Sequence, residues 1–305
     1  NTNGKPINIP ANATVTVPKD SMVTMLSTSG NFAKADPAKF IVNGTADFST
    51  VSMSNSINPG NEVTINGKLI TAHLGGLKGG MVSTNPSTVN VNLGSTIEYN
   101  APAGNQTITN TNVLQGSMPY DTLIISGGGI KTPGVASYVE SLVRITGTPT
   151  VNASANNFGK TGANTTLFQM DGGRLIFGST GTQPNMSGLY TLTGGVVEFA
   201  NNSVTAQTIN NGGTHYYQNI EVSGSNVANS SGYTNLNDLG TFTIKNGGVF
   251  SINNYSINGP TGTQTFTMES GSLLNCGNEP GFNGPNAGSN YFSVNSNIEN
   301  ISLAA

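Results

Sequence analysis

Apolar positions recur along this chain in one short pattern. Two apolar residues separated by one position are followed by one or two polar residues, a glycine and a second apolar run. Copies of the pattern begin at Phe40, Val63, Val91, Leu123, Val143, Phe168, Tyr190, Ile220, Phe242 and Phe266. Successive copies lie about 25 residues apart, and a fixed period of this size indicates a repeat architecture.

The spacing inside each copy predicts short strands. Apolar and polar residues alternate, which is strand spacing, and no stretch of the chain keeps helical spacing. The glycine lies between two alternating runs, where the chain has to turn. A copy is too short for a strand–helix–strand unit, which needs roughly 30 residues. Because two or three short strands cannot bury their own apolar face, we expect the units to stack as a solenoid.

The pattern therefore predicts an all-β fold, a right-handed parallel β-helix of about twelve coils with about 25 residues in each coil. The right hand is the usual hand of parallel crossovers. Stacking also places equivalent polar residues of neighbouring coils side by side. We therefore expect ladders of Asn and Thr side chains that hydrogen-bond from coil to coil.

A longer period of about 100 residues overlies the short one. Three segments match in order, namely 94–99 with 194–199, 106–108 with 207–209, and 120–127 with 217–224. The matched positions include Glu98 and Glu198, which both stand between apolar residues and are expected to point outward. Four coils therefore look duplicated as a block. The alternative is chance similarity in a chain of biased composition.

Two parts of the chain are expected to differ in regularity. Residues 1–60 are expected to form N-terminal coils and a possible cap, because an open coil end exposes strand edges and apolar core. Residues 61–305 are expected to form the β-helix, continuous with the first part as one solenoid. The segment 33–39 is the one stretch that could form a helical turn. Three segments lack clean alternation and are expected as loops: 73–88, 225–240 and 278–290.

Composition narrows the classes of function. Charged residues make up 8% of the chain, the net charge is −3 and no basic stripe occurs, so nucleic-acid binding is not expected. No apolar stretch approaches the length of a membrane-spanning helix. The single cysteine, Cys276, cannot form an internal disulfide and is expected as a small buried residue. The chain begins at Asn1 without a signal sequence, and we expect a mature or trimmed segment.

No catalytic constellation is predicted. A β-helix that cleaves carbohydrate needs paired carboxylates on neighbouring coils, and the positions after the second apolar residue hold no such pair. Lys245 and Glu269 are neighbours at that position, which predicts a surface ion pair. His73 and His215, the two histidines, are far apart in the repeat. We therefore predict no catalytic residue, no cofactor and no metal site.

One aromatic group is a possible sugar-binding patch. His215 and Tyr216, together with Tyr217, could stack on sugar rings. The alternative is an aromatic ladder in the core that includes at least one of the tyrosines. Pairs of threonines separated by one residue also occur, but they do not fall on consecutive coils, so ice binding is not favoured.

The matched segments also carry a resemblance to a family. Gln-Thr-Ile, followed by a Tyr-initiated strand that ends in Ser-Gly, occurs at 106–127 and 207–224 beside Asn-Gly-Gly turns. This arrangement resembles secreted repetitive surface proteins of Bacteroidota, the adhesin-like cargo of the type IX secretion system. The resemblance implies O-glycan acceptors in Asp-Ser/Thr-apolar triplets, which here would be Ser21 and Thr122.

These observations favour a non-enzymatic extracellular protein that is structural or adhesive, such as a stalk, a filament segment or an adhesin. It is expected to be secreted or at the cell surface, outside the outer membrane. Expected partners are a cell-surface or extracellular polysaccharide or protein, with self-association into a fibre as a further possibility. The alternative is a carbohydrate-binding or carbohydrate-cleaving β-helix with its site on the loops at 73–88 or 225–240.

Overall fold

The structure is a computed structural model, and it divides the chain into two compact units. The first unit holds residues 1–150 and 156–160, and the second holds 151–155 and 161–305. The described residues are 8–25, 32–34, 38–55, 61–82, 88–115, 119–153, 157–158, 166–211, 215–229, 234–253, 257–258, 264–276 and 296–299. Each unit is described separately below.

Both units are built from stacked coils of parallel strands. The chain is an all-β parallel solenoid of about nine turns with about 24 residues in each coil, so the predicted fold class and coil length are confirmed. The number of turns is smaller than the expected twelve, because a motif copy does not always correspond to one coil.

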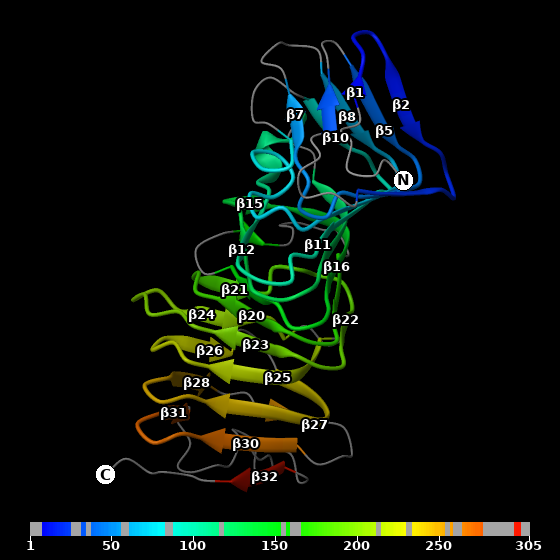
Figure 1. Cartoon of the computed structure of the whole chain (residues 1–305). Helices are drawn as coiled ribbons and strands as arrows, with labels where there is room; N and C mark the ends of the chain where they lie inside the picture. Colours follow the sequence, from blue (N-terminus) through cyan, green and yellow to red (C-terminus); the bar gives the residue numbers. More distant parts are fainter. Residues whose placement is uncertain are drawn as a thin grey trace. The chain divides into compact units, whose positions relative to one another are not determined.

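The first unit contains these elements: β1 (Asn8–Ile9), β2 (Thr14–Val17), β3 (Met22–Thr24), β4 (Phe32–Lys34), β5 (Lys39–Val42), β6 (Thr45–Asp47), β7 (Met53–Asn55), β8 (Glu62–Ile65), β9 (Lys68–Thr71), β10 (Thr88–Val91), β11 (Thr96–Tyr99), β12 (Asn105–Ile108), the 3-10 turn η1 (Thr111–Val113), β13 (Tyr120–Ile125), β14 (Ile130–Pro133), β15 (Ala136–Ser137), β16 (Val139–Ile145) and β18 (Asn157–Phe158). Within this unit the sheets run β10-β8-β5-β2, β16-β13-β11-β9-β6-β3, β12-β14, β1-β4-β7 and β15-β18. Figure 1 shows these strands in blue to green.

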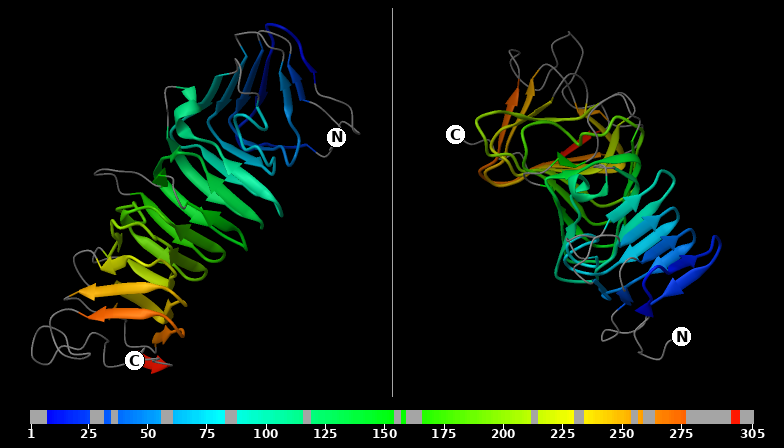
Figure 2. Two further views of the ribbon diagram at one scale, coloured as in Figure 1. Left: turned by 90° about the vertical axis from the view of Figure 1, so that its left-hand side faces the viewer. Right: turned by 90° about the horizontal axis from the view of Figure 1, so that it is seen from above.

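The second unit contains these strands: β17 (Thr150–Asn152, whose first residue belongs to the first unit), β19 (Leu167–Met170), β20 (Arg174–Phe177), β21 (Gly181–Gln183), β22 (Tyr190–Leu192), β23 (Val196–Phe199), β24 (Gln207–Ile209), β25 (Tyr216–Val222), β26 (Val227–Asn229), β27 (Thr234–Ile244), β28 (Val249–Asn253), β29 (Ile257–Asn258), β30 (Gln264–Met268), β31 (Leu273–Cys276) and β32 (Ser296–Glu299). Its sheets run β22-β19, β20-β23-β25-β27-β30-β32 and β21-β24-β26-β28-β31. Figure 2 shows β27 and β30 stacked in yellow and orange.

Apolar columns fill the interior of the first unit. The parallel register sets Phe40 of β5 opposite Val63 of β8 and Val63 opposite Val89 of β10, and all three side chains are buried. Stacking at this register removes their apolar surface from water, which is the main driving force for closing the coils. The third motif copy was expected to start at Val91. The register places it at Val89, two residues earlier, on the same inward face.

The motif marks a corner of the coil, and it is used at more than one corner. In the second unit Phe168 pairs with Tyr190, and Met170 with Leu192, as predicted for neighbouring coils. Ile220, however, lies opposite Val197 and not opposite Tyr190. The copies on β19 and β22 thus belong to one sheet and the copy on β25 to another. Counting copies therefore does not count coils.

The expected side-chain ladder is present at one corner of the first unit. The Asn66 side chain donates a hydrogen bond of 2.7 Å to the Asn43 side chain, and Asn92 donates one of 2.6 Å to Asn66. The three residues follow β5, β8 and β10, where the chain turns. Each bond joins one coil to the next, so the ladder adds polar contacts to the backbone ladder at an exposed corner.

The duplicated segments make the same contacts in their own units. The Gln106 side chain donates to the Thr71 carbonyl at 2.8 Å, and the Gln207 side chain donates to the Phe177 carbonyl at 3.0 Å. Both glutamines are buried. The hydroxyl of Tyr120 donates to the carbonyl of Thr109 and that of Tyr217 to the carbonyl of Asn210. The match between the segments therefore extends from the sequence to the interior hydrogen bonds.

Two local expectations are corrected by the structure. The start of the segment 33–39, expected as a possible helical turn, belongs to strand β4, which pairs in parallel with β1 and β7. The segment 225–240 was expected as a loop, but β26 and most of β27 lie within it. The register of β25 and β27 shifts between Tyr217 and Asn219, and this bulge disrupts the alternation that marks the other strands.

The other expected loops are described only in part. Residues 73–82 form turns held by backbone hydrogen bonds, such as that from Met81 to Gly76, and 83–87 lie outside the described residues. The segment 278–290 lies wholly outside them. Cys276 is the last residue of β31, and its side chain is not among those described.

Two corner glycines form a matched pair for a stability test. Gly94 and Gly127 both have positive φ angles, 82° and 75°. A Cβ atom on Gly127 would lie 2.6 Å from the carbonyl oxygens of Asn100 and Ala101, whereas a Cβ on Gly94 would meet nothing within 4 Å. Gly94→Ala is expected to cost about 1–2 kcal/mol from backbone strain alone. Gly127→Ala is expected to cost about 1–3 kcal/mol more, because the neighbouring coil must move. Hydrogen exchange in denaturant, read at β11 and β13, measures both costs, and equal losses would contradict the close packing at Gly127.

Candidate functional site

Three charged side chains of the second unit lie together on three neighbouring strands. Arg174 begins β20, Glu198 lies on β23 and Glu221 on β25, and the two glutamates stand directly opposite each other in the register. Strand alternation turns these side chains outward, because Leu175, Phe177 and their counterparts occupy the inward positions. We call these three residues the charged strip.

One arginine holds both carboxylates of the charged strip. The Nη1 atom of Arg174 lies 2.6 Å from an oxygen of Glu198 and 2.6 Å from an oxygen of Glu221. The hydrogen bond to Glu221 is the main cause that raises the pKa of Arg174. The hydroxyl of Ser223 donates a further hydrogen bond of 2.6 Å to Glu198. Charge-assisted bonds of this length are the strong class, so the strip binds three consecutive strands together.

A matching cluster occurs in the first unit. Lys68 of β9 lies 2.7 Å from Glu98 of β11, and the hydroxyl of Ser126 donates to Glu98 at 2.6 Å. The order is the same as in the charged strip: a basic residue one coil before the glutamate and a serine one coil after it. Glu98 and Glu198 thus have matching local surroundings, as the sequence match predicts, but β11 and β23 belong to different sheets, so the two glutamates are not at the same position of the coil. The residue opposite Glu98 on the next coil is Ile124, where the second unit has Glu221.

The carboxylate pair is absent from the sequence predictions because it does not lie at the position after the second apolar residue. Glu198 and Glu221 each stand between the two apolar residues that end a strand. The shared pattern, Val197-Glu-Phe199 and Ile220-Glu-Val222, was the available signal. The ion pair that was predicted, Lys245 with Glu269, is present at 2.5 Å.

The chemistry of the charged strip is that of an ion-pair bridge. A general acid must carry a proton to deliver, and a general base must have a free lone pair aimed at the substrate. Both carboxylates instead bond the same guanidinium nitrogen, and Glu198 also accepts from Ser223. The bonds to Arg174 and Ser223 each join neighbouring coils, so the arrangement favours structural cohesion.

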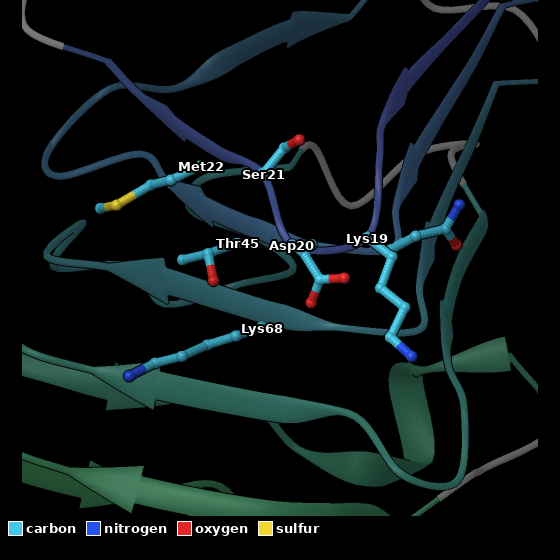
Figure 3. A pocket seen from close by; sticks show the side chains of 8 residues that line it. Lys19, Asp20, Ser21, Met22, Thr45 and Lys68 are labelled. Carbon is cyan, nitrogen blue, oxygen red and sulfur yellow. The ribbon is translucent and has the colours of Figure 1, made fainter.

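A separate hollow lies beside Ser21 in the first unit. It measures about 420 Å³ and is lined by Lys19, Asp20, Ser21, Met22, Asn43, Gly44, Thr45 and Lys68. Figure 3 shows Asp20 and Ser21 on one bend, with their side chains pointing in different directions. Asp20 has a φ of 62°, and the backbone amide of Thr45 donates to the Ser21 carbonyl at 2.8 Å. The bend is thus fixed by the next coil, while the Ser21 side chain stays exposed.

The second predicted glycan acceptor is less accessible. Thr122 lies on β13 between Thr96 and Leu142 of the flanking strands, and it is half-buried. Its hydroxyl is 3.4 Å from the carboxylate of Asp121. The structure does not bring Thr122 and Ser21 together, so the two positions are independent candidates.

The expected sugar-stacking role of His215 is corrected. Its ring is 5% exposed and stacks on Tyr190, with 3.9 Å between ring centroids and 13° between planes. Nδ1 of His215 lies 3.1 Å from the side-chain oxygen of Asn210. No ring face of His215 is therefore open to a sugar. Tyr217 is fully buried, as the alternative of a core aromatic ladder anticipates, and Tyr216 is 39% exposed on the outer side of β25.

The described part of the chain contains no group of three or more His, Cys, Asp or Glu side chains that could hold a metal ion. Nor does any helix in that part have the length and apolarity needed to cross a membrane.

Comparison with known proteins assigns no family. The chain matches no protein family, no curated protein and no solved structure.

The charged strip predicts a rescue experiment. Arg174→Gln leaves Glu198 and Glu221 facing each other without the cation that bonds both, and only the charge of Lys245 still acts on Glu221. The second unit is therefore expected to lose about 1–2 kcal/mol at neutral pH and low salt. Adding Glu221→Gln removes the repulsion and is expected to recover part of the loss. Denaturation followed by hydrogen exchange at β20, β23 and β25 measures both effects. An arginine variant as stable as the parent protein would show that the bridge contributes nothing.

The burial of His215 predicts its titration. Desolvation by burial lowers the pKa of His215 below the ordinary value of 6.5. The folded state therefore favours the neutral ring, and its stability should fall as the pH drops through 6.5 toward the folded pKa. NMR titration of the ring should give a value below 6.5 that Tyr216→Ala leaves unchanged. His215→Phe should remove part of the acid sensitivity of the second unit. An ordinary pKa would mean that the ring is exposed.

Proposed function

We propose that this protein is a non-enzymatic extracellular protein whose coils form a structural or adhesive surface element, such as a stalk, a filament segment or an adhesin. One observation carries the proposal: the outward side chains at stacked positions are used to bond one coil to the next. The asparagine ladder at Asn43, Asn66 and Asn92 and the charged strip of the second unit are the two clearest cases.

This use of surface groups supports a structural role in preference to an enzymatic one. Stacked repeats derive their stability from contacts between neighbours, so each polar bond between coils reinforces the array. Enzymes leave strained or unpaired groups at the reacting centre, with shifted protonation. Glu198 and Glu221, two carboxylates on neighbouring strands, instead share one guanidinium, that of Arg174.

The finer part of the proposal concerns origin and partners. We place the protein among secreted surface proteins of Bacteroidota, exported by type IX secretion to a position outside the outer membrane. Ser21, exposed beside its hollow, is proposed as the better O-glycan acceptor and half-buried Thr122 as the poorer one. The proposed partners are cell-surface or extracellular polysaccharides or proteins, or further copies of the chain in a fibre.

A carbohydrate-directed function remains the second proposal, on one specific observation. Tyr216 exposes 39% of its surface on the outer side of β25, where an aromatic ring can stack on a sugar. The site would then lie on the outer face of this strand and not on the expected loops. A binding role of this kind is compatible with an adhesin, whereas cleavage is not.

A polysaccharide panel separates these proposals. The purified chain is incubated with acidic and neutral polysaccharides, and reducing ends and unsaturated products are measured. We expect no products, and new products that persist on repeated purification would overturn the non-enzymatic proposal. The control is Tyr138, a half-buried tyrosine between β15 and β16 of the first unit. Retention on a polysaccharide column, weakened several-fold by Tyr216→Ala but not by Tyr138→Ala, would favour a binding surface at Tyr216.

Glycan mapping tests the finer proposal. Mass spectrometry of the native protein should find a hexose-containing modification on the peptide with Ser21, and Ser21→Ala should abolish it. Thr122 should carry less modification because its hydroxyl is half-buried. An unmodified Ser21 in the exported protein would contradict the glycoprotein assignment and leave the fold-based proposal to the panel above.

A further inference from the structure

A lysine lies in the core of the first unit. Lys131 is on β14, pairs in register with Gln106 on β12, and has no exposed surface. Gln106 is fully buried as well. Lysine is almost never fully buried unless it is paired with an opposite charge. This position therefore requires an explanation.

The Lys131 amine has only neutral partners. Its Nζ atom donates to the Ala101 carbonyl at 2.6 Å and to Oε1 of Gln106 at 2.9 Å. Across the described residues no carboxylate is within ion-pair distance of it. Burial lowers the pKa of Lys131 from 10.5 to about 8. About a tenth of the amine is therefore unprotonated at pH 7 and about half at pH 8, and an unprotonated amine is a nucleophile.

The carboxamide of Gln106 is held and polarised beside this amine. Its Oε1 also accepts a hydrogen bond of 3.1 Å from the backbone amide of Ala101. Its Nε2 donates to the carbonyls of Thr71 at 2.8 Å and His73 at 3.2 Å, which fixes the plane of the amide. A donor on the carbonyl oxygen stabilises the negative charge that develops there when a nucleophile adds to the carbon.

The duplicated segment provides an internal comparison. Gln207 occupies the position equivalent to Gln106 and also donates to two carbonyls, those of Phe177 and Ser179. Its register partner on the next coil is Val227, and its Oε1 atom is buried without a partner. The amine is therefore a feature of the first copy alone, and the shared glutamine does not require it.

We propose that Lys131 and Gln106 form an amide cross-link between two neighbouring coils. Nζ of Lys131 adds to Cδ of Gln106, so the Nζ–Cδ bond forms. The Cδ–Nε2 bond then breaks, a proton passes from Nζ to Nε2, and ammonia leaves. The exchange of one amide for another needs no oxidant, reductant or cofactor. The buried setting excludes the water that would otherwise hydrolyse the carboxamide.

The cross-link is independent of the proposed function. It would join β12 to β14 covalently, so these two coils could not separate even when the backbone hydrogen bonds between them break. Its presence or absence in the protein can be read directly, without an activity.

Peptide mapping of the folded wild-type protein is the deciding experiment. The protein is kept folded at pH 8, then denatured and digested with trypsin together with a protease that cuts before Asp121, because residues 79–130 contain no Lys or Arg and trypsin alone leaves residues 106 and 131 in one peptide. We expect one branched peptide, lighter than the sum of its two parts by one ammonia, and no tryptic cleavage after Lys131. The Gln207 peptide should remain unbranched. Separate peptides, with Lys131 open to acetylation after denaturation, would overturn the proposal.

Intact mass and variants provide the controls. Asn-Gly sequences such as Asn66-Gly67 also lose ammonia when they form succinimides, so the mass loss must vanish in Lys131→Met and survive hydroxylamine, which cleaves succinimides. If Lys131→Met does not fold, the peptide map of the wild-type protein still decides.

Formation of the cross-link should slow about tenfold for each pH unit well below 8, because the neutral amine is the reactant. A rate that does not change with pH would contradict attack by the amine.

Discussion

The parallel register between coils is the constraint on which the rest of the structure depends. Because each strand bonds a strand about one coil away, any residue is stacked on its counterparts above and below. Phe40, Val63 and Val89 form an apolar column for this reason, and Asn43, Asn66 and Asn92 form a polar one. A single geometric rule thus produces both the core and the bonded surface, which is why few charges suffice to hold the coils together.

Much of the fold follows from the sequence because strand alternation and turn glycines are local signals. The pairing of Met170 with Leu192 and the ion pair of Lys245 with Glu269 could be predicted from spacing alone. The bulge after Tyr217 could not, since it depends on how β25 meets β27. The carboxylate pair was equally hidden, because Glu198 and Glu221 become neighbours only when the register is known.

The positions of the buried polar groups likewise depend on contacts between residues that are far apart in the chain. A glutamine at a strand position gives no sign of whether it faces inward, and Gln106 and Gln207 do so because their amides satisfy carbonyls of the preceding coil. His215 looked like a surface residue beside Tyr216, yet the ring packs on Tyr190. In each case the deciding partner lies at least 25 residues away in the chain, beyond the reach of a pattern read along the sequence.

The reuse of one motif at different corners has a consequence for how such a chain can change. A strand with its turn can be gained or lost without new corner chemistry, because the next corner accepts the same residues. Such an insertion leaves the backbone ladder intact and moves every later residue to the adjacent side of the coil. Descendants of such a chain would then keep the same stacked side chains, but these side chains would point from a different side of the coil.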